Sequence, residues 1–163
     1  MESRLLETKS LILEKIKEAE SLIPYNYLPN LVPIKLVKDV PGWHDFEKAI
    51  WNIGEEIRLI LFDIPRLRKD QEIQAEFVRI AVNPNAKRGR QTFIMLLGYK
   101  FCSHHAKEIA SQIDDPFVEG HVIMTLRKMQ AKGYSTQVRP FLNSSITRVN
   151  NEAKKYLSLF DVC

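Results

Sequence analysis

The sequence predicts an all-helical single domain over residues 1–163, built as a short right-handed α-solenoid of antiparallel helix pairs. Apolar positions in the C-terminal half return about every 30 residues, a period typical of solenoids with two helices per unit. A polar corner precedes the second helix of each unit. Four of the eight prolines fall within residues 24–42, which separates an irregular N-terminal part from the repeats.

Residues 1–69 are expected to cap one end of the repeats. Apolar residues at helical spacing indicate a helix over about 2–23 and a second over about 43–62, which Pro65 closes. A further helix over about 70–82 joins the repeats. A terminal solenoid unit must cover an otherwise exposed core edge, which explains why this part departs from the period.

Residues 24–42, PYNYLPNLVPIKLVKDVPG, are predicted to be an extended strap packed on the helices. Proline lacks a backbone donor, so the segment excludes a regular helix and disfavours a central strand. It is too apolar for a free linker, and its side chains are expected to be buried. They are Tyr25, Tyr27, Leu28, Leu31, Val32 and Ile34.

Residues 70–163 are expected to hold about three repeats. In DDPFVEGHVIMTL (114–126) the aspartates and the proline mark a helix start, because a carboxylate accepts free N–H groups there and proline suits the first turn. Asp114-Asp115-Pro116 is therefore interpreted as a corner between helices and not as a catalytic acid pair. NPN (83–85) and NSS (143–145) take the same place in the neighbouring units.

Superposed units place apolar residues of the second helices at equivalent positions. Val118, Val122 and Leu126 match Val149, Ala153 and Leu157 at a spacing of 31, and Ile94 matches Ile123 at a spacing of 29. These helices are expected near 86–97, 116–131 and 146–160, roughly parallel in successive layers.

This pattern resembles HEAT-type repeats: an Asp-Pro corner, Val at the start of a helix, then Ala or Val and Leu on its inner face. The resemblance covers about residues 70–160. It departs from the family where Glu119 and Asn150 replace the usual arginine after the valine. The resemblance implies a HEAT-like solenoid with an extended groove, and some HEAT-like proteins are DNA glycosylases.

The composition is that of a soluble globular protein, with 45% hydrophobic and 27% charged residues. The longest apolar run, around FIMLLGY, is far shorter than the roughly 20 residues of a membrane span. The N-terminus is charged throughout, which is not typical of a signal peptide. With only Cys102 and Cys163, a cytoplasmic protein with free thiols is expected.

Charge is divided unevenly along the chain. Residues 1–82 hold 12 Lys and Arg against 14 Asp and Glu, whereas residues 83–163 hold 12 against 6. The cluster NAKRGRQ (85–91) is expected in the first turn of a helix, where the helix dipole opposes cations. Helix stability does not explain it. Two interpretations stay open: a solvated corner, where basic residues are common, and a basic corner that binds a partner's carboxylate or phosphate. The candidate partner-binding or anion-binding residues are Lys87, Arg88, Arg90, Arg127, Lys128, Lys132 and Arg148.

Catalytic and metal chemistry find little support in the sequence. Cys102, His104 and His105 lie close together but lack a clear second pair of zinc ligands, and a turn between helices accounts for them. His44 and Glu47 have the spacing of half a di-iron motif, which needs that motif twice. Glu55 and Glu56 are adjacent in sequence, so they diverge on a helix. No catalytic residue, metal ligand or cofactor is predicted.

The leading hypothesis for function is a non-enzymatic protein-binding module: an adaptor, an assembly factor or an immunity (antitoxin) protein that binds an acidic partner surface. Solenoids present extended surfaces and rarely enclosed pockets. The alternative is a nucleic-acid-binding HEAT-like protein, in the extreme a DNA-processing enzyme. The basic half favours it, but both tryptophans lie in the acidic half, away from the cations that would hold a strand.

Overall fold

The computed structural model of the protein describes residues 1–33 and 40–161. Helices account for 72% of the described residues, which contain no β-strand, so the predicted all-helical class is confirmed. The elements follow in this order: α1 Glu2–Ser21, α2 Asp45–Asp63, η1 Pro65–Lys69, α3 Gln71–Ala81, η2 Pro84–Arg90, α4 Gln91–Met95, η3 Lys100–His105, α5 Ala106–Ala110, α6 Glu119–Lys128, α7 Ser135–Val138, η4 Arg139–Asn143 and α8 Thr147–Phe160. The η elements are short 3₁₀ helices.

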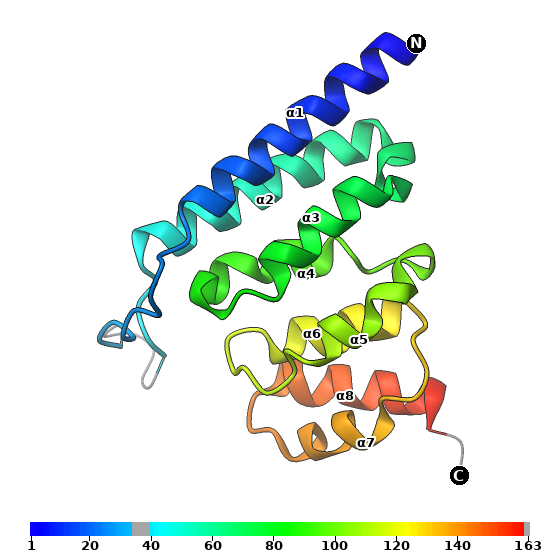
Figure 1. The fold of residues 1–163 in the computed structure, drawn as a ribbon. Helices are drawn as coiled ribbons and strands as arrows, with labels where there is room; N and C mark the ends of the chain where they lie inside the picture. Colours follow the sequence, from blue (N-terminus) through cyan, green and yellow to red (C-terminus); the bar gives the residue numbers. More distant parts are fainter. Residues whose placement is uncertain (34–39, 162–163) are drawn as a thin grey trace.

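The long helices α1 and α2 lie along each other at one end of the molecule (Figure 1). Their buried faces are isoleucine-rich at helical spacing, as the sequence predicts. The α2 helix begins at Asp45 because the Glu47 carboxylate accepts the backbone N–H of His44 at 2.7 Å, which is one half of a capping box. The α3 helix is capped by Asp70, whose carboxylate accepts the N–H of Ile73 at 3.0 Å.

The prediction of a single helix over 86–97 is wrong. The chain forms η2, then the short helix α4, and Lys87 inside η2 has φ 50° and ψ −130°, which interrupts the helical path. Gly89 permits the close approach that follows, since a Cβ there would lie 2.9 Å from the carbonyl oxygen of Glu47. The broken path turns the cations of this segment inward.

The other expected helices are present with changed lengths. The α6 helix is shorter than the expected 116–131, because the Asp115 carboxylate accepts the N–H of Phe117 at 2.9 Å and holds residues 115–117 in a turn. This turn agrees with the interpretation of Asp114-Asp115-Pro116 as a corner. The α8 helix agrees with the expected 146–160 to within one residue.

The predicted strap is only partly as expected. Its described residues, 24–33 and 40–42, form no helix or strand beyond one isolated bridge between Pro33 and Pro41. The prediction that its apolar side chains are buried is wrong at most positions. Tyr25 is 96% exposed, and Tyr27, Leu31 and Val32 are exposed as well. Only Leu28 is half-buried, and Ile34 lies outside the described residues. Hydrogen bonds from Asn85, Lys87 and Arg88 join the described residues of the strap to the main body.

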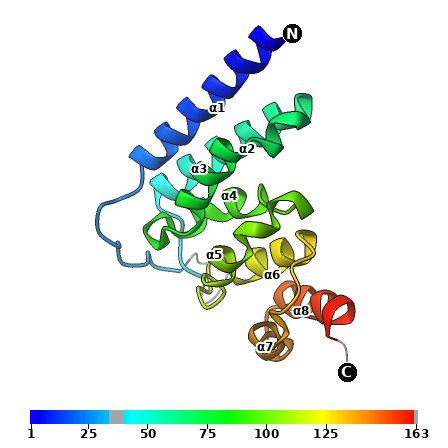
Figure 2. The same cartoon turned by 45° about the vertical axis from the view of Figure 1, so that its right-hand side comes forward.

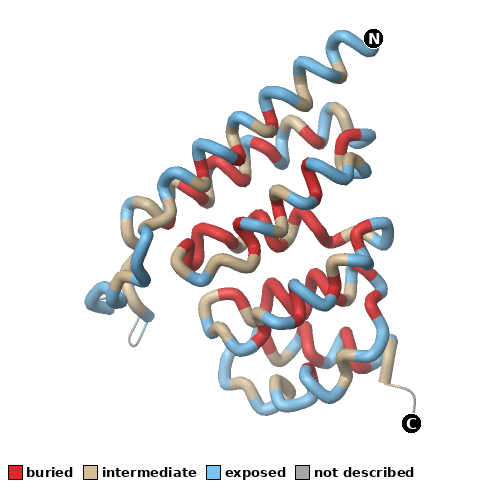
Figure 3. The backbone as a smooth tube through the Cα atoms, viewed as in Figure 1, coloured by how far each residue is buried: buried red, intermediate tan, exposed pale blue. Residues whose placement is uncertain are grey.

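The helices form layers from the α1–α2 end to the α7–α8 end (Figures 1 and 2). The α4 helix contacts α2 and α6, and α6 contacts α8; on the other side α3 contacts α1 and α5. The termini lie at opposite ends of the molecule (Figure 1). Buried residues follow the inner sides of the helices through most of these layers (Figure 3).

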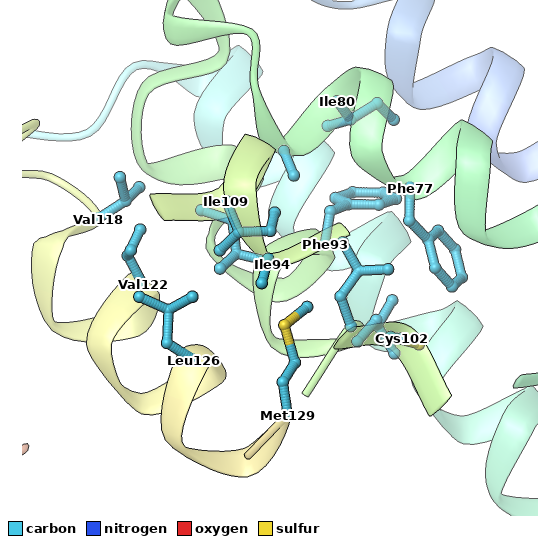
Figure 4. Close-up of a cluster of buried hydrophobic side chains, with 14 of the residues drawn as sticks. Phe77, Ile80, Phe93, Ile94, Cys102, Ile109, Val118, Val122, Leu126 and Met129 are labelled. Carbon is cyan, nitrogen blue, oxygen red and sulfur yellow. The ribbon is translucent and has the colours of Figure 1, made fainter. Parts of the chain in front are cut away.

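One hydrophobic cluster runs from Ile12 of α1 to Leu157 of α8. Its middle is drawn in Figure 4, where Phe77 of α3 meets Phe93 of α4 edge-to-face with ring centroids 6.1 Å apart. Val118, Val122 and Leu126 line the adjoining side of the cluster. No described helix is both long and apolar enough to cross a lipid bilayer.

Candidate functional site

The basic segment 87–90 is buried, which overturns the expectation of an exposed basic corner. Lys87, Arg88 and Arg90 are 1%, 6% and 0% exposed. Long cationic side chains are rarely buried unless they are paired. Their partners come from the strap, from α2 and from the corner before α6.

The Arg88 guanidinium contacts a carboxylate, two backbone carbonyl oxygens and two aromatic rings. Its Nε donates to Glu47 Oε1 at 3.1 Å, and its two terminal nitrogens donate to the carbonyl oxygens of Pro41 at 2.8 Å and Gly42 at 2.7 Å. The guanidinium lies 4.7 Å from the ring of Trp43 and 4.9 Å from the ring of Phe117. Its donors are used within the fold, so Arg88 joins the strap to α2 and does not project toward a partner.

Lys87 has no carboxylate partner among the described residues. Its Nζ donates to Asn30 Oδ1 at 2.7 Å and lies 3.9 Å from the ring centre of Tyr27. The ring of Phe117 is 5.3 Å away. Two aromatic faces and an amide oxygen stabilise this charge without neutralising it.

Arg90 connects three segments. One terminal nitrogen donates to the carbonyl oxygen of Ala81 at 2.7 Å and to Gln112 Oε1 at 2.8 Å, and the other donates to the Asp115 carboxylate. Burial lowers the pKa of Arg90, whereas the negative charge of Asp115 opposes that shift. Asp115 is thus committed to structure, which is consistent with its interpretation as a corner residue.

An open pocket of about 310 Å³ lies beside this cluster, at the N-terminal ends of α6 and α8. Most of its wall is apolar. The lining residues are Val40, Pro41, Arg88, Gln91, Pro116, Phe117, Glu119, Gly120, His121, Ile146, Arg148 and Val149. Among the described residues, no side chain caps the N-terminus of α6 or of α8, and the positive ends of both helix dipoles lie here.

Besides the paired Arg88, three titratable side chains give the pocket its polar character. His121 is 9% exposed and has no hydrogen-bond partner within the described parts of the chain. Burial, with a smaller effect of Arg148, lowers the pKa of His121 to about 4, so the ring is neutral at pH 7. Burial and the nearby Asp115 raise the pKa of Glu119. Arg148 is exposed and forms no ion pair with any described residue.

The seven candidate cations therefore do not form one ridge. Arg148 lies in the pocket wall near the buried trio, whereas Arg127 is paired with Glu152 of α8 at 3.3 Å. Lys128 and Lys132 are exposed at the other end of α6. The seven candidate residues therefore do not share one binding surface, because the two ends of α6 lie apart.

The residues considered for metal or catalytic chemistry have structural surroundings. Within residues 1–33 and 40–161, no group of three or more His, Cys, Asp or Glu side chains could hold a metal ion. Burial raises the pKa of Cys102 to about 11, which disfavours a thiolate. Glu55 is bonded to Arg58 and Glu56 to Lys15, so the two carboxylates point to different partners.

Sequence reasoning missed the pocket and its histidine. His121 lies on an apolar helical face, where a histidine gives no signal of its own. The pocket needs the corner before α6, the turn before α8 and the strap, which are far apart in the chain. Only the absence of a capping side chain at Val118 and Ile146 is readable from the sequence.

No protein-family model, curated protein or solved structure matches the chain.

Proposed function

We propose that the protein is a non-enzymatic protein-binding module, a short HEAT-like solenoid that docks an acidic partner segment in the pocket between α6 and α8. The partner places an apolar side chain against the pocket wall and a carboxylate at Arg148. The buried trio of Lys87, Arg88 and Arg90 is the support of this site and not its contact surface.

The order of helix contacts supports the solenoid. One series of contacts runs through α2, α4, α6 and α8, and a second runs through α1, α3 and α5. The residues superposed by the 31-residue spacing are all buried: Val118, Val122 and Leu126 in one unit, Val149, Ala153 and Leu157 in the next. Equivalent burial at equivalent positions is typical of stacked repeats.

The observation that carries the proposed activity is the composition of the pocket. Its wall is mainly apolar, and Arg148 is the one cation of the wall without an ion pair among the described residues. Two helix N-termini that no described side chain caps face it. An apolar hollow with a cation at its rim complements an acidic and hydrophobic segment. The neutral His121 offers one further hydrogen bond to the bound chain.

Charge reversal at Arg148 tests this proposal. Arg148→Glu leaves the fold intact, because the side chain is exposed and a glutamate in the first turn of α8 suits the helix dipole. Partner binding weakens by about 2 kcal/mol or more, because like charges then face each other. The matched control is Lys154→Glu, an exposed cation on the same helix that does not line the pocket.

The measurement is capture from nuclease-treated native lysate on immobilised wild-type protein and the two variants, at low and at physiological salt. A protein retained by wild type and by Lys154→Glu but lost by Arg148→Glu supports the proposal, and titration then gives the change in affinity. Equal retention by both variants, or no protein retained by wild type, contradicts docking in this pocket.

A further inference from the structure

A second basic surface lies at the end of the molecule opposite the strap, where two short helices meet. It comprises Arg66, Arg68 and Lys69 of η1 with Tyr99, Lys100 and Phe101 at the start of η3; we call it the η1–η3 patch. Around it is an open hollow of about 340 Å³ lined by Pro65, Arg66, Arg68, Lys69, Tyr99 and Phe101. The two segments are about 30 residues apart in sequence, and both lie at the right of the view in Figure 1.

Two aromatic rings form the centre of the η1–η3 patch. Tyr99 and Phe101 are stacked, with ring centroids 5.2 Å apart and planes inclined by 9°. Phe101 is exposed and Tyr99 is half-buried. The Arg68 guanidinium lies 5.2 Å from the ring centre of Tyr99, and the Lys69 ammonium lies 5.5 Å from that of Phe101.

The patch is built on a fixed support. Leu67, between the two arginines, is buried in the core. The side-chain amide of the buried Gln74 donates to the carbonyl oxygen of Arg68 at 2.8 Å. Within the described residues, the buried Nε of Arg68 has no hydrogen-bond partner. The guanidinium of Arg68 is therefore fixed by packing against the ring of Tyr99.

The charge of the patch is not neutralised. Within the described chain, Arg66, Arg68, Lys69 and Lys100 form no ion pair, and no acidic side chain is among the residues that line the hollow. Lys128 of α6 lies beside Gly98, next to Tyr99 in the sequence, since its Cβ lies 3.3 Å from where a side chain on Gly98 would begin. Three cations without an ion pair among the described residues line the hollow beside two stacked rings, and Lys100 stands between these rings in the sequence. Cations beside exposed aromatic rings are the arrangement that binds single strands in many proteins.

We propose that the η1–η3 patch binds single-stranded nucleic acid, with a base stacked on Phe101 and the adjacent phosphates held by Arg66, Lys69 and Lys100. The incoming base takes the face of Phe101 that Lys69 covers, and the displaced ammonium contacts the neighbouring phosphate. A duplex hides the faces of its bases and gains only the phosphate contacts. An acidic peptide gains the charge contacts but has no flat ring for Phe101. This activity is separate from the proposed protein docking, which uses the other end of α6.

The test is fluorescence anisotropy with dye-labelled oligothymidylate and oligouridylate against the purified full chain, at several salt concentrations. Wild type binds both strands, and the affinity falls steeply as salt rises. Phe101→Ala weakens binding roughly tenfold, because one base loses its stacking partner. The control Phe62→Ala removes an exposed phenylalanine from α2 and leaves the affinity unchanged.

A second variant separates charge from stacking. Lys100→Glu reverses an exposed cation and lowers the salt dependence by about one phosphate contact, whereas Lys154→Glu on α8 leaves it unchanged. Circular dichroism and thermal unfolding establish that each variant is folded.

Three outcomes overturn the proposal: no binding of either strand, equal affinity for a duplex of the same length, or equal affinity for an acidic peptide or heparin with no effect of Phe101→Ala. None of these results depends on whether Arg148 docks a protein, so the two proposals fail independently.

Discussion

Arg90 is a charged side chain with no exposed surface, and partners from two places in the chain, the end of α3 and residues 112–115, stabilise its charge. Replacement by Met keeps the apolar volume but leaves Asp115, Gln112 and the carbonyl oxygen of Ala81 without their donor. We expect Arg90→Met to lower the free energy of unfolding by about 3 kcal/mol or more, as measured by urea titration. The exposed Lys154→Met should change it by less than about 0.5 kcal/mol.

An Arg90→Met variant as stable as wild type would show that the Asp115 contact contributes nothing net. Replacing Arg88 or Arg90 by glutamate would not test partner binding. A glutamate at either position would be buried among hydrogen-bond acceptors and would destabilise the fold. A loss of partner binding in such a variant would result from unfolding and not from a lost contact with the partner.

His121 makes the stability depend on pH. In the unfolded chain its pKa is near 6.5, whereas in the fold burial lowers the pKa to about 4. Between these pH values His121 is protonated in the unfolded state but not in the folded state. The contribution of the neutral His121 to the free energy of unfolding is therefore complete above pH 6.5 and is lost as pH falls toward 4. The loss amounts to about 3 kcal/mol. Urea titrations across this range should show a steeper decline for wild type than for His121→Leu.

The control for this experiment is Asn151→Leu, which replaces an exposed side chain of α8 that carries no titratable group. That variant should keep the pH dependence of wild type. Parallel curves for wild type and His121→Leu would mean that His121 is solvated when it is protonated.

At the scale of elements, the strap depends on polar contacts. Arg88 donates to the carbonyl oxygens of Pro41 and Gly42, and Asn85 donates to those of Pro24 and Tyr25 at 3.1 and 3.0 Å. Arg88→Met removes two of these bonds and the pair with Glu47. We expect chymotryptic cleavage beside the exposed Tyr25 and Tyr27 to become roughly tenfold faster, because the strap opens more often.

Arg148→Met is the matched control for strap opening, since it removes an exposed arginine that forms no ion pair with the described strap residues. Its cleavage rate should equal that of wild type. If Arg88→Met is cleaved no faster, the remaining contacts of Asn85 and Lys87 are sufficient to hold the strap.

The helices differ in how far the sequence could predict them. The α1, α2, α3 and α8 helices agree with their periodicity to within about two residues, because each buries one continuous apolar face. The segment 84–95 does not, because its conformation is decided by where Lys87, Arg88 and Arg90 find partners. A window of local sequence contains neither Glu47 nor Asp115, so it carries no information about that choice.

At the scale of the whole molecule, one core cluster joins the N-terminal helices to α8. We therefore expect a single cooperative unfolding transition. Both tryptophans lie in or beside α2, so their fluorescence reports the N-terminal end, whereas far-ultraviolet circular dichroism reports all helices. The two signals should give the same midpoint and slope in urea. A later or earlier loss of ellipticity would show that the α5–α8 end unfolds separately, as nearest-neighbour stacking allows.

The sequence by itself determined the helical class, the corners at residues 83–85, 114–116 and 143–145, and most of the buried apolar positions. These follow from local rules, since a period of 3.6 residues and a capping side chain act within one turn or two. The tertiary structure alone decided which cations are free. Lys87, Arg88 and Arg90 look like a surface cluster until Glu47, Asp115 and the strap are brought to them. Arg66, Arg68 and Lys69 lie in the acidic half of the chain, beside Tyr99 and Phe101, and form no ion pair with any described residue. Burial and pairing of a charge depend on contacts between distant segments, and those contacts exist only once the helices have packed.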